Sequence, residues 1–184
     1  MVLGLFGSIG VAVIALLVFV ILLSLYAYAK LARLDGFLHT SWDNIQLLIE
    51  KRYNSIPDLV LVVKQYGIHE KELIEEVVSM RLFSMGIIDI EKKAEAEFGV
   101  KQALQSLFNI AENYPDLKVN KKFLALQEEL QKIEKALQLE RKKYNKAAGQ
   151  YNSLISTFPS NMVANFAKFI RKPYFKANKD ELIR

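Results

Sequence analysis

Residues 121–158, KKFLALQEELQKIEKALQLERKKYNKAAGQYNSLISTF, repeat apolar side chains at a spacing of seven residues. One apolar position of each heptad holds Phe123, Leu130, Leu137, Tyr144, Tyr151 and Phe158, and the other holds Leu126, Ile133, Ala147 and Leu154. This period places both positions on one side of an α-helix, so the stretch predicts a long, coiled-coil-like helix that packs along its length. Asn120 is a candidate N-cap, and we expect the helix to stop before Pro159.

A similar apolar face occurs nearer the N-terminus. It is formed by Trp42, Ile45, Ile49, Ile56, Leu59, Val63 and Tyr66. Pro57 lies inside this pattern, and we expect it to kink the helix rather than end it, because the apolar spacing continues on both sides. We expect Gly67 to end the helix, since glycine readily adopts the positive φ of a C-terminal cap.

Two shorter helices are expected between the long ones. One runs from His69 to about Phe83, and the other covers residues 87–112. Residues 84–86 and 114–116 have the composition of turns. No stretch alternates polar and apolar residues as a strand does. The sequence therefore predicts an all-α fold, with an up-and-down bundle of three or four helices.

The first 29 residues contain no charged side chain. About 20 apolar residues span the hydrocarbon of a bilayer, so residues 1–29 predict a transmembrane helix. A cleaved signal peptide is the alternative, because residues 27–29 read Ala-Tyr-Ala, but the apolar run is about twice the usual length. Lys30 and Arg33 follow at once, so the positive-inside rule places the N-terminus outside the cell membrane and residues 30–184 in the cytoplasm.

The predicted organisation is a transmembrane anchor (1–29), a cytoplasmic helical bundle (30–158) and a basic amphipathic tail (159–184). The tail holds six Lys and Arg residues against two acidic ones, a surplus of four in a chain whose net charge is +5. Its candidate membrane-surface residues are Lys168, Phe169, Arg171, Lys172, Tyr174 and Phe175. Alternatively, the same aromatic side chains cap the open end of the bundle. Nucleic-acid binding is not expected, because the basic residues are few.

Two charged residues interrupt the apolar faces. Arg52 falls on the face of the first long helix, and Glu140 falls on that of the last. A buried charge is costly unless it is paired, so we expect each to have an opposite partner, and the two could pair with each other. Such a polar cluster either fixes the register of the helices or lines a cavity for a ligand or ion.

Residues that carry catalysis are scarce. The chain has no Cys and only two His, His39 and His69, so thiolate and His-rich metal sites are excluded. The glycines are scattered rather than gathered in a phosphate-binding loop, and no Ser lies in a nucleophile motif. We therefore predict no catalytic residue, no metal site and no cofactor, and we do not expect an enzyme.

Several motifs follow one another along the chain. They are Arg52, Pro57-Asp58-Leu59-Val60, Gln65-Tyr66-Gly67-Ile68-His69-Glu70-Lys71, Ala111-Glu112-Asn113-Tyr114-Pro115-Asp116-Leu117-Lys118, Phe123-Leu124-Ala125-Leu126-Gln127-Glu128-Glu129-Leu130, Glu134, Arg141-Lys142-Lys143-Tyr144-Asn145, Tyr151-Asn152, Phe158-Pro159-Ser160-Asn161 and Lys172-Pro173-Tyr174-Phe175. In this order, over about residues 30–176, they resemble the LemA family of membrane-anchored helical proteins. The resemblance implies a four-helix, up-and-down bundle behind one N-terminal anchor. Relatives occur in magnetosome-membrane formation, which implies scaffolding or membrane organisation rather than catalysis.

The chain departs from the family pattern in residues 82–100, which begin with a bulky apolar run. Phe83, Ile87 and Ile88 are therefore candidates for a protein contact. The expected function is a non-enzymatic membrane scaffold that self-associates as a homo-oligomer. The alternative is an adaptor that recruits a membrane protease or another envelope protein through its bundle. The lipid bilayer, further copies of the chain and a membrane protein are thus the expected partners.

Overall fold

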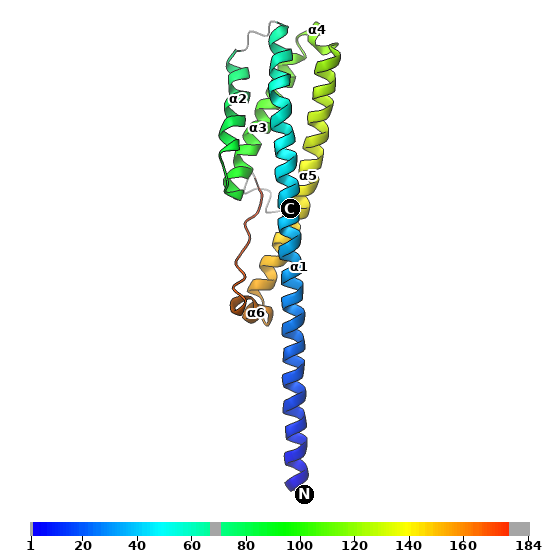
Figure 1. Cartoon of the computed structure of the whole chain (residues 1–184), viewed down its shortest axis with the longest axis vertical. Helices are drawn as coiled ribbons and strands as arrows, with labels where there is room; N and C mark the ends of the chain where they lie inside the picture. Colours follow the sequence, from blue (N-terminus) through cyan, green and yellow to red (C-terminus); the bar gives the residue numbers. More distant parts are fainter. Residues whose placement is uncertain (1, 67–70, 177–184) are drawn as a thin grey trace. The chain divides into compact units, whose positions relative to one another are not determined.

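The computed structural model describes residues 2–66 and 71–176, with side chains from Gly10 onward. Within these ranges the chain is helical and has no strand (Figure 1). The helices are α1 (Val2–Gln65), α2 (Lys71–Met85), α3 (Ile90–Ala111), α4 (Pro115–Lys118), α5 (Lys121–Ser156) and α6 (Ser160–Phe166). The predicted all-α fold with long helices is confirmed.

The chain divides into two compact units. The first unit consists of Met1–His39 and Lys146–Lys172, and the second unit consists of Thr40–Asn145 and Pro173–Arg184. Both long helices, α1 and α5, contribute residues to both units.

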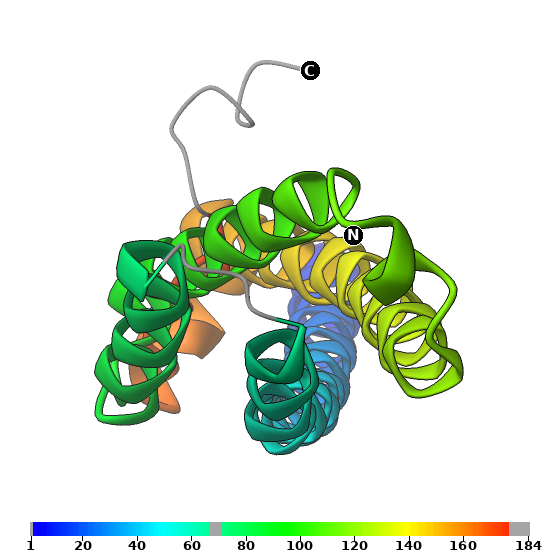
Figure 2. The same cartoon turned by 90° about the horizontal axis from the view of Figure 1, so that it is seen from above.

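The second unit is a four-helix bundle. It contains the C-terminal part of α1, α2, α3 and most of α5, which Figure 2 shows around a common centre. Both predicted apolar faces are buried in it. The buried residues are Ile45, Ile49, Ile56, Leu59 and Val63 from α1, and Phe123, Leu126, Leu130, Ile133, Leu137 and Tyr144 from α5. The seven-residue spacing of α5 therefore does place its apolar side chains in the core.

Helix ends follow from local hydrogen bonds. The Asn120 side chain accepts a hydrogen bond from the backbone N–H of Phe123 at 3.0 Å, so the predicted N-cap of α5 is confirmed. Asp89 caps α3 in the same way through the N–H of Lys92 at 2.9 Å, which is why this helix begins three residues later than expected. Gly67 and His69, the predicted ends of two helices, lie outside the described residues.

The first unit packs the tail against α1 and α5. Its buried side chains include Leu31, Leu38, Ala147, Tyr151 and Ala164. The tail, predicted to be amphipathic, is helical only as far as Phe166, where α6 ends. Lys168 has a φ of 56°, a left-handed conformation that does not continue a right-handed helix. Phe158 is also not core, because α5 ends before it and its side chain is exposed.

The N-terminal part of α1 presents apolar side chains outward. The large apolar side chains from Val11 to Leu25 are exposed along the helix. By length and composition, α1 could cross a membrane, and among the described residues it is the one helix that could do so.

Candidate functional site

A buried ion-pair cluster joins three helices of the second unit. Arg52 of α1 has only 3% of its surface exposed. Its guanidinium donates hydrogen bonds to Glu97 of α3 and, at 3.4 Å, to Glu134 of α5. Burial lowers the pKa of Arg52, whereas the charge of Glu134 raises it. The two carboxylates therefore offset the cost of removing this cation from water.

A second layer of polar groups surrounds Glu97. The hydroxyls of Tyr53 and Ser84 both donate hydrogen bonds to its carboxylate. The Lys93 ammonium donates to the backbone carbonyl of Ser84 at 2.6 Å and lies 5.3 Å from the centre of the Tyr53 ring. Burial raises the pKa of Tyr53 and lowers the pKa of Lys93. This layer links α2 to the cluster through Ser84.

The cluster also includes cations other than Arg52. Its carboxylates are Glu97 and Glu134, and its cations are Arg52, Lys93, Lys101 and Arg141. Lys101 pairs with Glu134 at 2.9 Å, and the positive charge of Arg141 lowers the pKa of Arg52. The Nε atom of Arg52 is buried and has no hydrogen-bond partner among the described atoms. Arg52 and Lys101 are thus both paired with carboxylates of the cluster.

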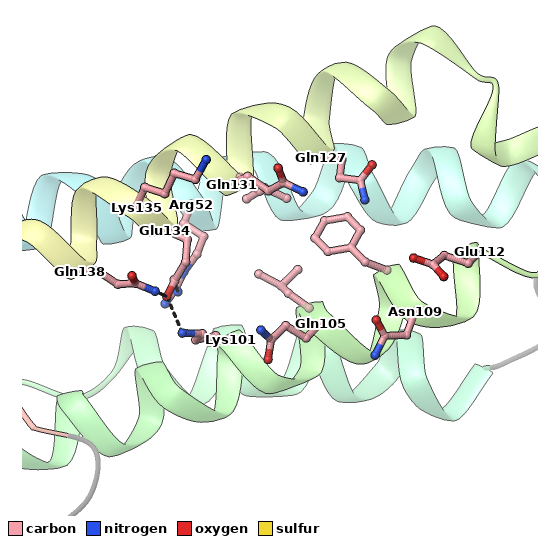
Figure 3. A pocket seen from close by; sticks show the side chains of 13 residues that line it. Arg52, Lys101, Gln105, Asn109, Glu112, Gln127, Gln131, Glu134, Lys135 and Gln138 are labelled. Atoms are coloured by element: carbon pink, nitrogen blue, oxygen red, sulfur yellow. Dashed lines mark hydrogen bonds and ion pairs between the residues drawn. The ribbon is translucent and has the colours of Figure 1, made fainter. Parts of the chain in front are cut away.

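A groove of about 480 Å³ opens beside this cluster, between α3 and α5. Its apolar lining is formed by Leu104, Phe108 and Leu130. Five side-chain amides also line it, from Gln105, Asn109, Gln127, Gln131 and Gln138. Figure 3 shows Gln105 and Asn109 of α3 facing Gln127 and Gln131 of α5. Arg52, Lys101 and Glu134 lie at one end of the groove, and Glu112 lies at the other.

Arg52 and Glu140 each have a partner of opposite charge, as expected, but they do not pair with each other. Arg52 pairs with Glu97 and Glu134, whereas Glu140 binds Lys143 one turn along α5 at 2.8 Å. Glu140 lies on the apolar face of the heptad pattern, but its side chain remains 16% exposed. It therefore reaches a partner on its own helix.

The tail residues predicted at a membrane surface fall into two groups. Lys168 and Arg171 are exposed. In the first unit, Phe169 packs on Tyr151 with ring centroids 6.2 Å apart, and the Lys172 ammonium pairs with Asp35 at 2.6 Å.

The other two residues predicted at a membrane surface, Tyr174 and Phe175, belong to the second unit. Tyr174 is half-buried, and Phe175 is 2% exposed, with its ring centroid 5.5 Å from that of Trp42. Phe175 is therefore a core residue rather than a surface one, as the alternative interpretation of the tail expected.

An exposed apolar patch occupies the end of α2 and the turn that follows. Its members, the 82–88 patch, are Leu82, Phe83, Met85 and Ile88. Ile88 is 93% exposed, and Phe83 is 65% exposed. Ile87, which was also a candidate for a protein contact, is half-buried and is therefore not counted in the 82–88 patch. These residues remain candidates for an interface.

Sequence reasoning missed both carboxylate partners of Arg52, Glu97 and Glu134. Glu97 lies between the buried Ala94 and Val100, so it interrupts the apolar face of α3 as Arg52 interrupts that of α1. That signal was available in the sequence. The amide side chains of the groove have no such signal, because exposed Gln residues are ordinary on helices.

Among the residues described, no group of three His, Cys, Asp or Glu side chains is placed to hold a metal ion. A search of curated proteins finds no match to the chain. The LemA family matches residues 41–183, which include every residue of the cluster and of the groove. This match covers most of the sequence, and the chain therefore belongs to the LemA family.

Proposed function

We propose that this chain is a single-pass membrane protein that forms a scaffold with further copies of itself and catalyses no reaction. The exposed apolar side chains from Val11 to Leu25 support a place in the bilayer. Outside a membrane this large apolar surface would be in contact with water, which is unfavourable. Lys30 and Arg33, immediately after the segment, support an N-terminus outside and a bundle in the cytoplasm.

The observation that carries self-association is the 82–88 patch of the second unit. An exposed cluster that includes Phe83, Met85 and Ile88 is typical of protein interfaces, where aromatic residues and Met are enriched. We propose that two or more copies cover this patch together.

Crosslinking in membranes tests the scaffold. The chain lacks cysteine, so a single introduced thiol reports one position. We expect the Met85→Cys chain to form a crosslinked dimer with a short bis-maleimide, and Phe83→Ser in the same chain to reduce the dimer at least threefold. Glu72→Cys, an exposed position on α2 outside the patch, is the matched control. Recovery of monomer alone from the Met85→Cys chain would contradict self-association through this surface.

The groove between α3 and α5 favours a second candidate function. An adaptor that recruits a membrane protease or another envelope protein needs a binding site on its bundle, and the groove is open, lined by amides and has charged side chains at both ends. A site-specific photocrosslinker at Asn109, on the wall of the groove, tests this role in cells. Crosslinks to other membrane proteins that persist in the Phe83→Ser chain support an adaptor, and crosslinks to nothing but the chain itself count against one.

A further inference from the structure

The first unit carries a surplus of positive charge. It contains six Lys and Arg residues, whereas its one acidic residue is Asp35. This surplus of five equals the net charge of the whole chain, so the second unit is neutral in sum. Lys172 binds the Asp35 carboxylate at 2.6 Å. The other five cations are exposed and pair with no carboxylate within the described ranges; they are Lys30, Arg33, Lys146, Lys168 and Arg171.

Two contacts fix the level of the tail along α1. The ring centroid of Phe169 lies 5.8 Å from that of Tyr28, and the Lys172 ammonium reaches Asp35. Tyr28 is three residues, about 4.5 Å, beyond Leu25, the end of the apolar segment proposed to lie in the bilayer. Asp35 is seven residues, about 10 Å, further along α1. The tail therefore meets α1 just beyond the apolar segment, and then runs away from that segment toward Lys172.

Hydrogen bonds hold one set of tail side chains inward. The N–H of Phe169 donates to the carbonyl of Ala164 at 2.9 Å, and the Asn152 amide binds both backbone groups of Lys172, at 2.8 and 2.9 Å. The Phe169 ring packs on Tyr151, and the Lys172 ammonium lies 5.7 Å from the centre of the same ring. The two residues between them, Ile170 and Arg171, are exposed.

The outward side chains of this segment are both apolar and basic. Phe166 is 92% exposed and Ile170 is 73% exposed. The bond between Phe169 and Ala164 places the end of α6 at the level of Phe169, and hence near Tyr28. We call the exposed set the interfacial surface; its members are Phe158, Met162, Phe166, Lys168, Ile170 and Arg171. Aromatic and basic residues together are typical of segments that lie in a membrane interface.

A shallow hollow adds polar groups close to this surface. Its volume is about 420 Å³, and it is lined by Lys30 of α1 and by Gly149, Gln150, Ser153 and Leu154 of α5. The carbonyl of Leu154 accepts a hydrogen bond from the Ser160 hydroxyl at 2.7 Å, so the hollow adjoins the start of α6. Its ammonium, amide and hydroxyl groups are donors that suit the phosphate of a lipid headgroup.

The position and the charge of the interfacial surface favour a bilayer as the occupant. A bilayer surrounds the helix that crosses it, so exposed residues near Tyr28 meet its surface on whichever side of α1 they lie. The cytoplasmic leaflet contains anionic lipids, and each cation close to it strengthens binding by about fivefold. A neutral lipid surface would leave the five exposed cations of the first unit without a counterpart.

We propose that the interfacial surface is a second membrane contact, which binds anionic lipids of the leaflet from which α1 emerges. Phe166 and Ile170 enter the headgroup region, and Lys30, Lys168 and Arg171 bind the negative groups of the lipids. This inference rests on the membrane anchor of the proposed function, and it is independent of the 82–88 patch and of the groove.

Fluorescence quenching in nanodiscs that hold one full-length chain each tests the inference. The chain lacks cysteine, so Met162→Cys carries a single environment-sensitive NBD probe next to Phe166. The discs consist of phosphatidylcholine alone or of its mixture with phosphatidylserine, and both contain lipids with a nitroxide quencher near the headgroup. We expect at least twofold stronger quenching in the mixture, because the cations draw the surface into an anionic leaflet.

Matched variants separate the two contributions. Lys168→Gln with Arg171→Gln should reduce quenching in the mixture to that in phosphatidylcholine. Lys121→Gln with Lys122→Gln removes two exposed cations from the second unit and should change nothing. Phe166→Ser with Ile170→Ser should reduce quenching at least twofold in both compositions, because it removes the apolar contact. The fluorescence of Trp42, in the second unit, checks that each variant is folded.

A second probe separates this inference from the anchor. Leu16→Cys, inside the apolar segment, should be quenched in both compositions by lipids with the nitroxide at the end of the acyl chain. A quenched Leu16→Cys probe with an unquenched Met162→Cys probe would overturn the lipid contact and leave the anchor intact. The absence of quenching at both positions would contradict the anchor itself.

Three further outcomes would overturn the inference. Equal quenching of the Met162→Cys probe in the two compositions would show that the surface does not select anionic lipids. Undiminished quenching in the Lys168→Gln, Arg171→Gln chain would show that these cations do not bind them. A shift of the probe emission to shorter wavelength without quenching would show that protein, rather than lipid, covers the surface.

Discussion

At the scale of single residues, Arg52 organises the bundle. Its burial forces carboxylates from two other helices to meet it, so α1, α3 and α5 can pack in few alternative registers. Tyr53 and Ser84 then donate to Glu97, which leaves this carboxylate with partners from α1 and α2. The cluster therefore specifies how the helices are rotated as well as where they lie.

Removal of the Glu97 charge should destabilise the second unit strongly. In Glu97→Gln, Arg52 stays buried with one carboxylate fewer, and we expect the free energy of unfolding to fall by about 3 kcal/mol or more. The matched control is Glu140→Gln, whose partner lies on the same helix, with an expected loss under about 1 kcal/mol. Denaturant unfolding followed by the fluorescence of Trp42, the single tryptophan, measures both. Equal losses in the two variants would mean that the buried ion pairs of the cluster stabilise the fold no more than an ion pair within one helix does.

Tyr144 should make stability depend on alkaline pH. Burial raises its pKa from 10.0 to about 12. Between pH 10 and 12 the folded chain keeps the proton of Tyr144, whereas the unfolded chain loses it. The contribution of this phenol to the free energy of unfolding is therefore complete below pH 10 and disappears as the pH rises to 12. We expect wild type to lose up to about 2 kcal/mol more than Tyr144→Phe between pH 9.5 and 11.5, after allowance for solvent screening.

The Tyr144→Phe variant also loses the hydrogen bond to the carbonyl of Pro173, which lowers its stability by a constant amount at every pH at which the wild-type phenol is protonated. Other buried tyrosines, including Tyr53, titrate in both proteins, so the difference between them isolates Tyr144. Trp42, whose ring centroid lies 6.1 Å from that of Tyr144, reports unfolding in both. Parallel pH profiles would contradict the raised pKa.

At this scale the sequence reveals a buried charge more readily than its partners. Arg52 was identified because it breaks an apolar face, which is a property of one helix. Its pairing with Glu97 and Glu134 depends on how three helices rotate against one another, and one-helix periodicity contains no such information. The choice of Glu140 as a possible partner failed for this reason.

At the scale of elements, α5 was the most predictable part of the chain. Its heptads predicted a helix over residues 121–158, and α5 covers Lys121–Ser156. The tail was less predictable, because its residues have an amphipathic pattern although its helix, α6, ends at Phe166. Contacts across the fold, such as Phe175 on Trp42, decide the conformation of such a segment.

The amide of Asn145 should hold the tail in place. Asn145→Ala removes both hydrogen bonds to the backbone of Phe175, and we expect the amide hydrogen of Phe175 to exchange roughly tenfold faster. Gln150→Ala, an exposed amide on the same helix, is the control and should leave this exchange unchanged. Hydrogen–deuterium exchange with mass spectrometry of the tail peptide measures both variants. Unchanged protection in Asn145→Ala would show that the packing of the Phe175 ring alone fixes the segment.

At the scale of the whole molecule, one continuous helix carries both the exposed apolar segment and Arg52 of the bundle. The sequence predicted a membrane segment from the charge-free run and a bundle helix from the apolar face that follows it, as two separate features. The sequence could not predict the groove, because its walls belong to α3 and α5 and its shape depends on how these two helices pack. Its amide side chains come from two helices and lie together only in the folded bundle.

Labelling of single cysteines should reveal the orientation of the chain in the membrane. We expect a membrane-impermeant maleimide to label Val2→Cys in intact cells and to label Gln102→Cys only after the cells are opened. Both residues are uncharged, and Gln102 is exposed on α3, so its access to reagent depends on the membrane rather than on burial. The reverse pattern would contradict the orientation proposed from Lys30 and Arg33.

The regular row of Asn152, Asn145, Gln138 and Gln131 limits how α5 can change in length. Insertion of one residue between Leu137 and Tyr144 would turn everything after it by about 100° around the helix axis. The apolar face and the amides would then lose alignment together. Insertion of seven residues would turn it by only about 20°. Natural variants of this helix should therefore be longer or shorter in steps of seven.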